Sequence, residues 1–158
     1  MTTRQLVLAV LAAAVTVTSV AAASPVAARQ RVAITASGVA SPTSSGKFVL
    51  IPLDAGALEV DRGTETSTWT TRVVMRDGQR VEIANWVTTC QGKRGTLVLR
   101  LRIEHVDAGN DYVVGTGTWK VVRGTGEYAG VTGSGGVGTM YRHGGRWNER
   151  REGFLTAP

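Results

Sequence analysis

The sequence predicts an all-β fold, an antiparallel up-and-down barrel of about eight strands preceded by a signal peptide. Apolar and polar residues alternate with a period of two, as in residues 96–104, where three leucines and an isoleucine share one face. Beyond the N-terminal segment, no stretch shows the helical spacing of apolar residues. Short turns such as Asp77-Gly78 join the alternating runs and therefore indicate antiparallel neighbours. A meander of this length protects its edges when it closes into a barrel.

Residues 1–28 match the pattern of a secretory signal peptide. One early arginine precedes an uncharged apolar run, Leu6–Val20, and small residues follow. We predict cleavage after Ala28; Ala23 is the competing site, but a proline lies just beyond it. The alternative is an uncleaved membrane anchor, because the uncharged run approaches the roughly 18 residues of a spanning helix. Secretion predicts an extracellular or envelope-associated protein without stable membrane insertion after cleavage.

Behind the signal peptide we expect two segments. Residues 29–45, rich in Ser, Thr and Gly toward their end, predict a flexible lead-in, and residues 46–158 predict a single barrel domain. A mature chain of roughly 130 residues is long enough for one hydrophobic core.

The strands of the barrel domain are predicted from runs rich in β-branched and aromatic residues. In order, these runs are 46–53, 66–76, 79–90, 96–104, 111–122, 138–143 and 146–156. Two-residue type I′ turns are predicted at 77–78 and 144–145, and slightly longer turns at 91–95 and 108–110.

The stretch 117–136 is dense in glycine and raises the question of a phosphate-binding loop. The pattern G-x-G-x-x-G occurs at Gly133, Gly135 and Gly138, but a dinucleotide site needs a helix directly after it. The residues that follow predict a hairpin instead. A Walker loop would need Ser or Thr after Lys47, where the chain has Phe. We therefore predict that these glycines serve positive φ angles and close backbone approach, and that the protein uses no nucleotide cofactor.

The same stretch carries a family resemblance. Residues 124–133 read Gly-Thr-Gly-x-Tyr-x-Gly-x-x-Gly and follow the Gly-x-Trp of residues 117–119. This motif resembles the allene oxide cyclase and dirigent superfamily, and most closely its small secreted bacterial members of actinobacterial type. The resemblance covers residues 47–156 and implies an eight-stranded antiparallel barrel with a central cavity. Plant members cyclise fatty-acid epoxides or steer phenoxy-radical coupling and commonly form dimers or trimers, which makes a homo-oligomer a candidate assembly. The catalytic residues of the plant members lie on strands that do not match this sequence position by position, so the resemblance assigns no catalytic residue here.

The charge balance indicates the class of partner. The chain has 18 Lys and Arg against 12 Asp and Glu, a net charge of +6. The positive residues are scattered, and even the cluster Arg146, Arg150 and Arg151 is interrupted by Glu149 and Glu152. Because no basic run is interleaved with aromatics, we predict no nucleic-acid partner. An acidic cell envelope fits the charge better.

Residues that support common catalytic chemistry are few. With two histidines, one cysteine and no H-E-x-x-H or G-x-S-x-G motif, the sequence predicts no metal site and shows no catalytic motif. His105 is predicted at the rim or core and His143 on the surface. Cys90 is interpreted as a small buried hydrophobe, with a reactive thiol as the alternative. Glu149 and Glu152 face opposite sides of one strand and cannot act as a carboxylate pair.

The candidate ligand-binding residues are Trp147, Glu149 and Arg151, which share one face of the last strand. We predict that they line the cavity mouth, with the acid and the guanidinium paired as a polar anchor. The alternative is an exposed strand with ion pairs of little energetic value. Trp86 and Trp119 are each open to two interpretations, core packing or ligand stacking.

Three functions stay open at this point. The first is a secreted barrel that binds a small, largely apolar ligand without chemistry, because the barrel is of the right size and no catalytic set is evident. The second is a cyclase or isomerase acting on a lipid-like or phenolic substrate, with Glu149 transferring a proton. The third is an envelope structural or interaction protein.

Overall fold

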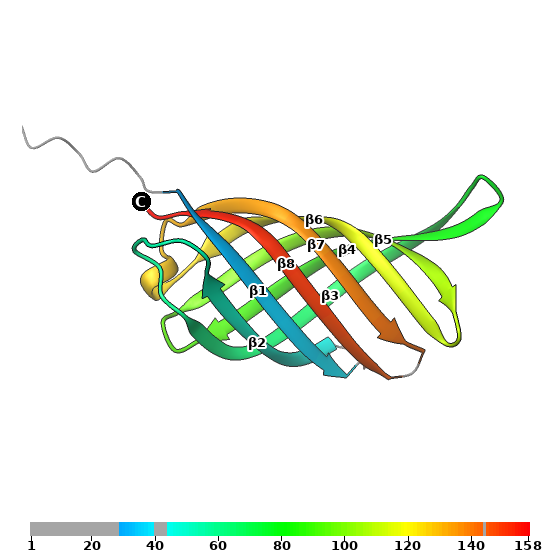
Figure 1. The fold of residues 1–158 in the computed structure, drawn as a ribbon, viewed down its shortest axis with the longest axis horizontal. Coiled ribbons are helices and arrows are strands. Elements are labelled where there is room, and N and C mark those ends of the chain that lie inside the picture. Colours follow the sequence, from blue (N-terminus) through cyan, green and yellow to red (C-terminus); the bar gives the residue numbers. More distant parts are fainter. Residues whose placement is uncertain (1–28, 40–43, 144) are drawn as a thin grey trace, which may run out of the picture.

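The computed structural model describes residues 29–39, 44–143 and 145–158, and the predicted signal peptide lies outside them. Eight strands form a closed antiparallel barrel in which each strand pairs with its neighbours in sequence (Figure 1). The strands are β1 (Arg29–Val39), β2 (Ser44–Pro52), β3 (Asp61–Arg76), β4 (Gln79–Gly92), β5 (Thr96–Gly109), β6 (Tyr112–Gly124), β7 (Thr132–Arg142) and β8 (Arg146–Thr156). A single turn of 3-10 helix, η1 (Gly126–Tyr128), connects β6 to β7. The all-β barrel prediction is confirmed.

The first strand corrects the prediction for residues 29–45. Instead of a flexible lead-in, residues 29–39 form β1, which closes the barrel by pairing with both β2 and β8. Val32 and Ile34 alternate toward the interior and are almost fully buried. Pairing on both sides satisfies the backbone donors and acceptors that an edge strand would leave open.

The hairpin turns follow the positive-φ rule. Asp77 and Gly78 have φ angles of 52° and 78°, which confirms the predicted type I′ turn between β3 and β4. The β5–β6 turn lies at Asn110 and Asp111, with φ angles of 52° and 69°, slightly later than predicted. Gly144, in the other predicted two-residue turn, lies outside the described residues. In Figure 1 the β3–β4 hairpin projects well past the end of the barrel.

The glycines of the G-x-G-x-x-G pattern lie in a strand. Gly133, Gly135 and Gly138 all belong to β7, so no helix follows them. At Gly135 an added Cβ would lie 2.0 Å from the carbonyl oxygen of Glu152 on the neighbouring strand, whereas at Gly138 it would meet nothing within 4 Å. Close backbone approach therefore explains Gly135 and does not explain Gly138.

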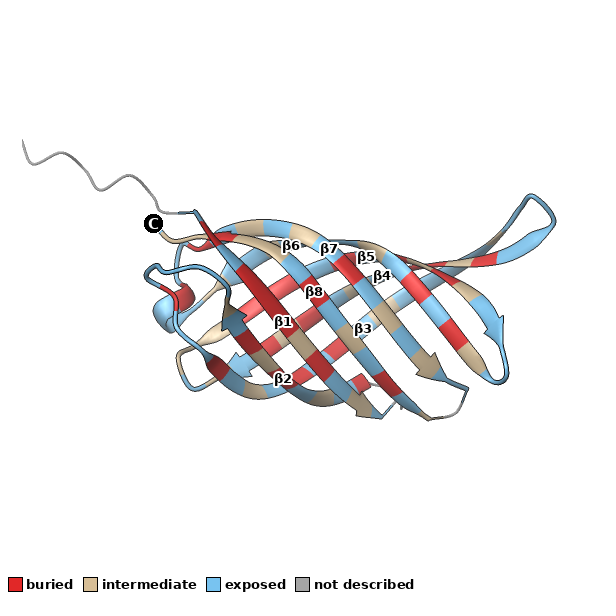
Figure 2. Ribbon diagram, in the orientation of Figure 1, coloured by how far each residue is buried: buried red, intermediate tan, exposed pale blue. Residues whose placement is uncertain are grey.

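One end of the barrel interior is filled by side chains. Buried and exposed residues alternate along the strands (Figure 2), as a barrel wall requires. The filled end contains the apolar side chains of Ile34, Leu50, Leu97, Leu99, Leu101, Trp119 and Leu155. Leu50, Leu99 and Leu155 are fully buried.

Tyr128 of η1 closes this filled end. Its ring is buried, and its hydroxyl donates a 2.9 Å hydrogen bond to the carboxylate of Asp61. Asp61 also accepts a 3.0 Å hydrogen bond from the backbone N–H of Lys93. The hydroxyl of Tyr128 thus finds its partner in a buried side chain.

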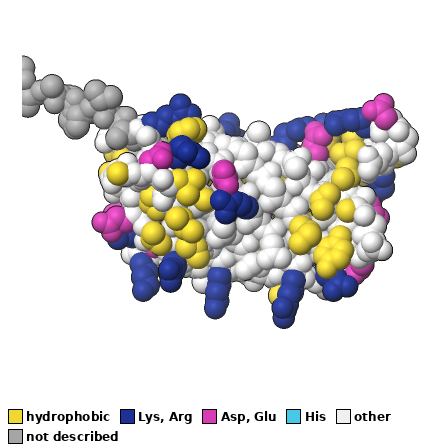
Figure 3. Space-filling model, in the orientation of Figure 1, with side chains coloured by type: hydrophobic (Ala, Val, Ile, Leu, Met, Phe, Trp, Pro, Cys, Tyr) yellow, Lys and Arg dark blue, Asp and Glu magenta, His cyan; other side chains and the backbone are white. Residues whose placement is uncertain are grey.

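The outer surface carries the basic residues as dispersed charges. Lys and Arg side chains are scattered over the face seen in Figure 3, with acidic side chains between them. Several are paired, as in the exposed contact of Arg150 with Glu152 at 2.6 Å. Within the residues that the structure describes, no helix is long and apolar enough to cross a membrane.

Candidate ligand pocket

The opposite end of the barrel, where β2 and β8 begin, is hollow. It encloses a cavity of about 160 Å³, comparable to a cavity that accommodates a benzene ring. The inward-facing positions of the strands here carry aromatic and polar side chains. The lining residues are Ser44, Glu65, Ser67, Trp69, Glu82, Trp86, Ile103, His105, Thr139, Tyr141, Trp147 and Glu149.

A buried ion-pair cluster lies at the inner end of this cavity. The guanidinium of Arg151 forms a two-point contact with the carboxylate of Glu65, at 2.8 Å from Nη1 and 2.7 Å from Nη2. The side chains are 1% and 2% exposed. The Nε–H of Arg151 donates to Glu149, which is 10% exposed and lines the cavity. Strands β3 and β8, which are not neighbours in the barrel wall, are therefore joined through its interior.

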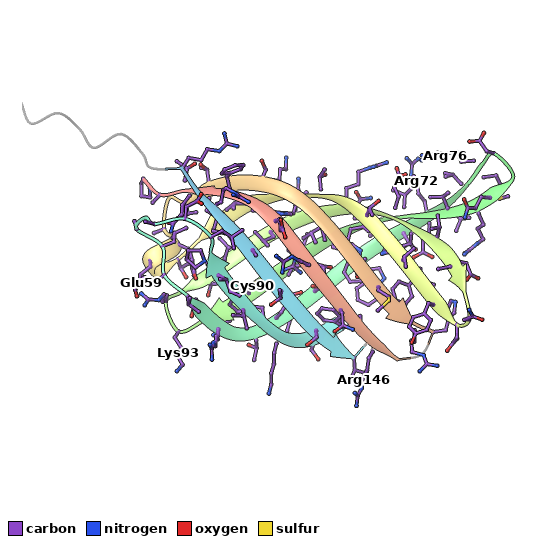
Figure 4. The ribbon with its side chains drawn as sticks, in the orientation of Figure 1. Glu59, Arg72, Arg76, Cys90, Lys93 and Arg146 are labelled. Atoms are coloured by element: carbon purple, nitrogen blue, oxygen red, sulfur yellow. The ribbon has the colours of Figure 1, made fainter. Side chains whose placement is uncertain are left out.

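Cys90 belongs to the same cluster. Its Sγ lies 3.4 Å from Glu65 Oε2 and 3.8 Å from Arg151 Nη1. Glu65 and Cys90 are register partners on β3 and β4. Figure 4 places Cys90 within the body of the barrel, whereas Arg72 and Arg76 lie on the projecting hairpin.

Burial sets the protonation states in the cluster. Burial raises the pKa of Glu149 above its ordinary value; the neighbouring Arg151 opposes this shift and Glu65 adds to it. Burial opposes the charge on Arg151, but the carboxylates of Glu149 and Glu65 raise its pKa overall, so it stays a cation. Burial and the charge of Glu65 raise the pKa of Cys90, which keeps the thiol protonated and poorly nucleophilic.

Aromatic rings form much of the remaining wall. Trp69 and Trp86, opposite each other on β3 and β4, stack with ring centroids 4.5 Å apart and planes inclined by 23°. His105 meets Tyr141 edge to face at 5.5 Å. Burial lowers the pKa of His105, so its imidazole is neutral at pH 7. Trp147, 9% exposed, contributes the indole of β8.

Three polar atoms on these rings are buried without a hydrogen-bond partner among the described residues. They are Nε1 of Trp86, Nε1 of Trp147 and Nδ1 of His105. A buried polar group without a partner costs about 1–3 kcal/mol. All three atoms have almost no accessible surface, so they lie within the wall and do not open onto the cavity.

No family model, curated protein or solved structure matches this chain. The resemblance of residues 124–133 to the allene oxide cyclase and dirigent superfamily therefore stays a prediction. Within the described part of the chain, no group of three or more His, Cys, Asp and Glu side chains is placed to hold a metal ion.

The structure places the predicted site residues on the inner face of β8. Trp147 and Glu149 line the cavity, and Arg151 lies deeper, engaged by the two carboxylates. The alternative of an exposed strand applies only to the other face, which carries Glu152 and Arg150. Ligand binding by these residues stays a prediction.

The structure distinguishes Trp86 from Trp119, the two tryptophans for which the sequence allowed either core packing or ligand stacking. Trp119 packs in the filled core, where its indole N–H donates to the backbone oxygen of Glu152 at 3.3 Å, and Trp86 lines the cavity. His105 is buried at the cavity wall and His143 is exposed, both as predicted. Cys90 is buried as predicted, although its neighbours are charged.

Sequence reasoning missed Glu65 and Glu82. Glu65 shares the parity of Trp69 in the run 61–76, so an inward-facing tryptophan could have assigned it to the interior. Glu82 has the parity of Trp86 and Cys90 on the next strand. Neither signal is strong, because threonines flank Glu65, whereas Val81 and Ile83 flank Glu82 and their alternation would assign that residue to the outer face.

Proposed function

We propose that the protein binds a small, largely apolar molecule in the hollow end of its barrel. The observation that carries this proposal is the cavity of about 160 Å³, walled by Trp69, Trp86, Tyr141 and Trp147, in a barrel whose other end is filled. Apolar clefts with a few convergent polar groups are typical of small-molecule sites. An eight-stranded barrel has room for side chains or for one small ligand.

The frame around the cavity supports a preformed site. The barrel is closed along all its strands, and the Arg151–Glu65 contact joins the non-neighbouring strands β8 and β3 through the interior. A rigid cavity loses little conformational entropy when a ligand enters, which favours affinity.

Calorimetric titration of the purified protein with phenol and benzyl alcohol tests the proposal. Ser67, which lines the cavity and hydrogen-bonds Thr88 at 2.8 Å, offers a matched pair of variants. Ser67→Leu should abolish binding by filling the cavity, whereas Ser67→Ala should retain it while losing the same hydrogen bond. Absence of saturable binding in the wild type, or equal binding in both variants, would overturn the proposal.

Acid-catalysed isomerisation or cyclisation is the second candidate, and Glu149 is the observation that favours it. A carboxyl group at a cavity wall whose pKa is raised by burial holds its proton to a higher pH than an exposed carboxyl group does and can donate it to a bound molecule. With any substrate that is turned over, Glu149→Gln should lower kcat at least 100-fold, within the range typical of general acids. Unchanged turnover in that variant would remove Glu149 from the mechanism.

The proposed location is outside the cytoplasm, secreted or associated with the envelope. It rests on the signal-peptide pattern of residues 1–28 and on the excess of positive charge. N-terminal sequencing of protein secreted by an expression host tests it. Cleavage after Ala28 should give Arg29 as the first residue. Recovery of the full chain from the membrane fraction would favour the uncleaved anchor.

A further inference from the structure

We infer that the ligand of this pocket is a small organic cation, an ammonium group on a ring-sized apolar body. This inference rests on the proposed function and adds the charge of the ligand. It follows from the charges that line the cavity, from the contacts of Arg151 behind its wall and from the aromatic rings.

The charges around the cavity are predominantly negative. Glu65, Glu82 and Glu149 line it, and none of the described lining residues is Lys or Arg. Arg151, behind the wall, is the cation of the cluster. With Glu149 ionised the four side chains sum to −2, and with Glu149 protonated they still sum to −1. In both protonation states of Glu149, the net charge around the cavity favours a cationic ligand.

Arg151 is not free to receive an anion. Its Nη1 and Nη2 contact Glu65 and its Nε contacts Glu149, so all three nitrogens are engaged. Its side chain is only 1% exposed. A carboxylate or phosphate ligand would therefore lie beside Glu149 and Glu82 without a free counter-charge, which is unfavourable.

The aromatic wall favours the same class of ligand. Trp69, Trp86, Tyr141 and Trp147 all line the cavity. Electron-rich rings, tryptophan most of all, attract cations, and the attraction is larger when the cation is removed from water. His105, the fifth ring, adds no opposing charge because its imidazole is neutral at pH 7. Aromatic rings together with carboxylates recognise both the apolar body and the charge of an ammonium compound.

Three ligands of nearly equal shape test the inference: benzylammonium, benzyl alcohol and benzoate, titrated at pH 7 and low salt. We expect benzylammonium to bind at least about 10-fold more tightly than benzyl alcohol, and benzoate most weakly. Equal or tighter binding of benzyl alcohol or benzoate would overturn the inference and leave the proposed pocket standing. Absence of binding by all three would overturn both.

Glu82 provides the decisive variant because it is partly exposed and can be neutralised without leaving a buried charge unpaired. Glu82→Gln should weaken benzylammonium binding about 3- to 10-fold and leave benzyl alcohol unchanged. Glu152→Gln, on the outer face of β8, is the matched control and should change neither. Circular dichroism confirms folding of each variant. Unchanged benzylammonium affinity in both Glu82→Gln and Glu149→Gln would overturn the inference.

Discussion

Arg151 and Glu65 face each other through the interior of the barrel and form a two-point ion pair with N–O distances of 2.7 and 2.8 Å. The pair connects the last strand to the third strand, 86 residues apart in the sequence. Because both charges are removed from water, each depends on the other for its solvation.

Removal of one partner of this pair should destabilise the protein strongly. Arg151→Met leaves Glu65 and Glu149 buried beside an apolar side chain, and the free energy of unfolding should fall by about 3–5 kcal/mol at pH 7. Urea denaturation followed by tryptophan fluorescence measures the loss. Arg150→Met, at the exposed neighbouring position, should cost less than about 1 kcal/mol. Similar losses in the two variants would contradict a structural role for the buried pair.

The raised pKa of Glu149 predicts a pH dependence with a defined sign. Because the folded protein holds this proton more tightly than the unfolded chain does, Glu149 contributes stability below its ordinary pKa of about 4.5, and this contribution is lost as pH rises through the higher folded-state pKa. The difference in Tm between wild type and Glu149→Gln should therefore change as the pH is raised above about 4.5. Glu152→Gln should follow the wild-type profile, and parallel profiles for all three proteins would contradict the assignment.

The contact between Tyr128 and Asp61 should stabilise the filled end of the barrel. Tyr128→Phe removes a buried donor to a carboxylate and should lower the free energy of unfolding by about 1.5–3 kcal/mol. Tyr112→Phe, at a partly exposed tyrosine on β6, is the matched control and should cost less than about 0.5 kcal/mol. Equal effects would show that the Tyr128 hydroxyl gains nothing from Asp61.

Two glycines of β7 should respond in opposite directions to alanine. Gly135→Ala places a Cβ 2.0 Å from a backbone oxygen and should cost about 1–3 kcal/mol, because strands β7 and β8 must separate. Gly138→Ala meets nothing within 4 Å and should be neutral or stabilising by up to about 1 kcal/mol. Thermal denaturation of the two variants measures the difference, and tolerance of alanine at both positions would refute the close approach at Gly135.

The thiol of Cys90 should react very slowly with thiol reagents in the folded protein. The thiol is 1% exposed and its pKa is raised by burial, so it should react with a disulfide reagent at least about 1000-fold more slowly in buffer than in 6 M guanidinium chloride. Absorbance of the released thiolate follows the reaction. Rapid modification without denaturant would mean that the barrel opens readily.

Local signals account for most of the fold that could be predicted. Asp77-Gly78 specifies a two-residue turn and residues 96–104 specify a half-buried strand, and both features depend only on nearby residues. The strand β1 was missed because Val32 and Ile34 are followed by small polar residues typical of a loop. Its pairing partners on β8, Thr156 and Arg146 among them, lie more than 100 residues away, and no local pattern encodes that closure.

The pocket was predictable only in part. The common parity of Trp147, Glu149 and Arg151 places them on one face, which the structure bears out. That Arg151 finds Glu65 across the interior depends on barrel closure and on the stagger of the strands, which set the opposing residues. The division into a filled end and a hollow end likewise arises from how eight strands combine, since no single strand shows it.

Because Arg29 and Thr156 pair at the filled end, the polypeptide enters and leaves the barrel on the side away from the pocket. A linker, affinity tag or neighbouring domain joined at either position would thus extend from the rear of the molecule. Immobilisation through such a joint would leave the aromatic cavity directed toward the surrounding solution.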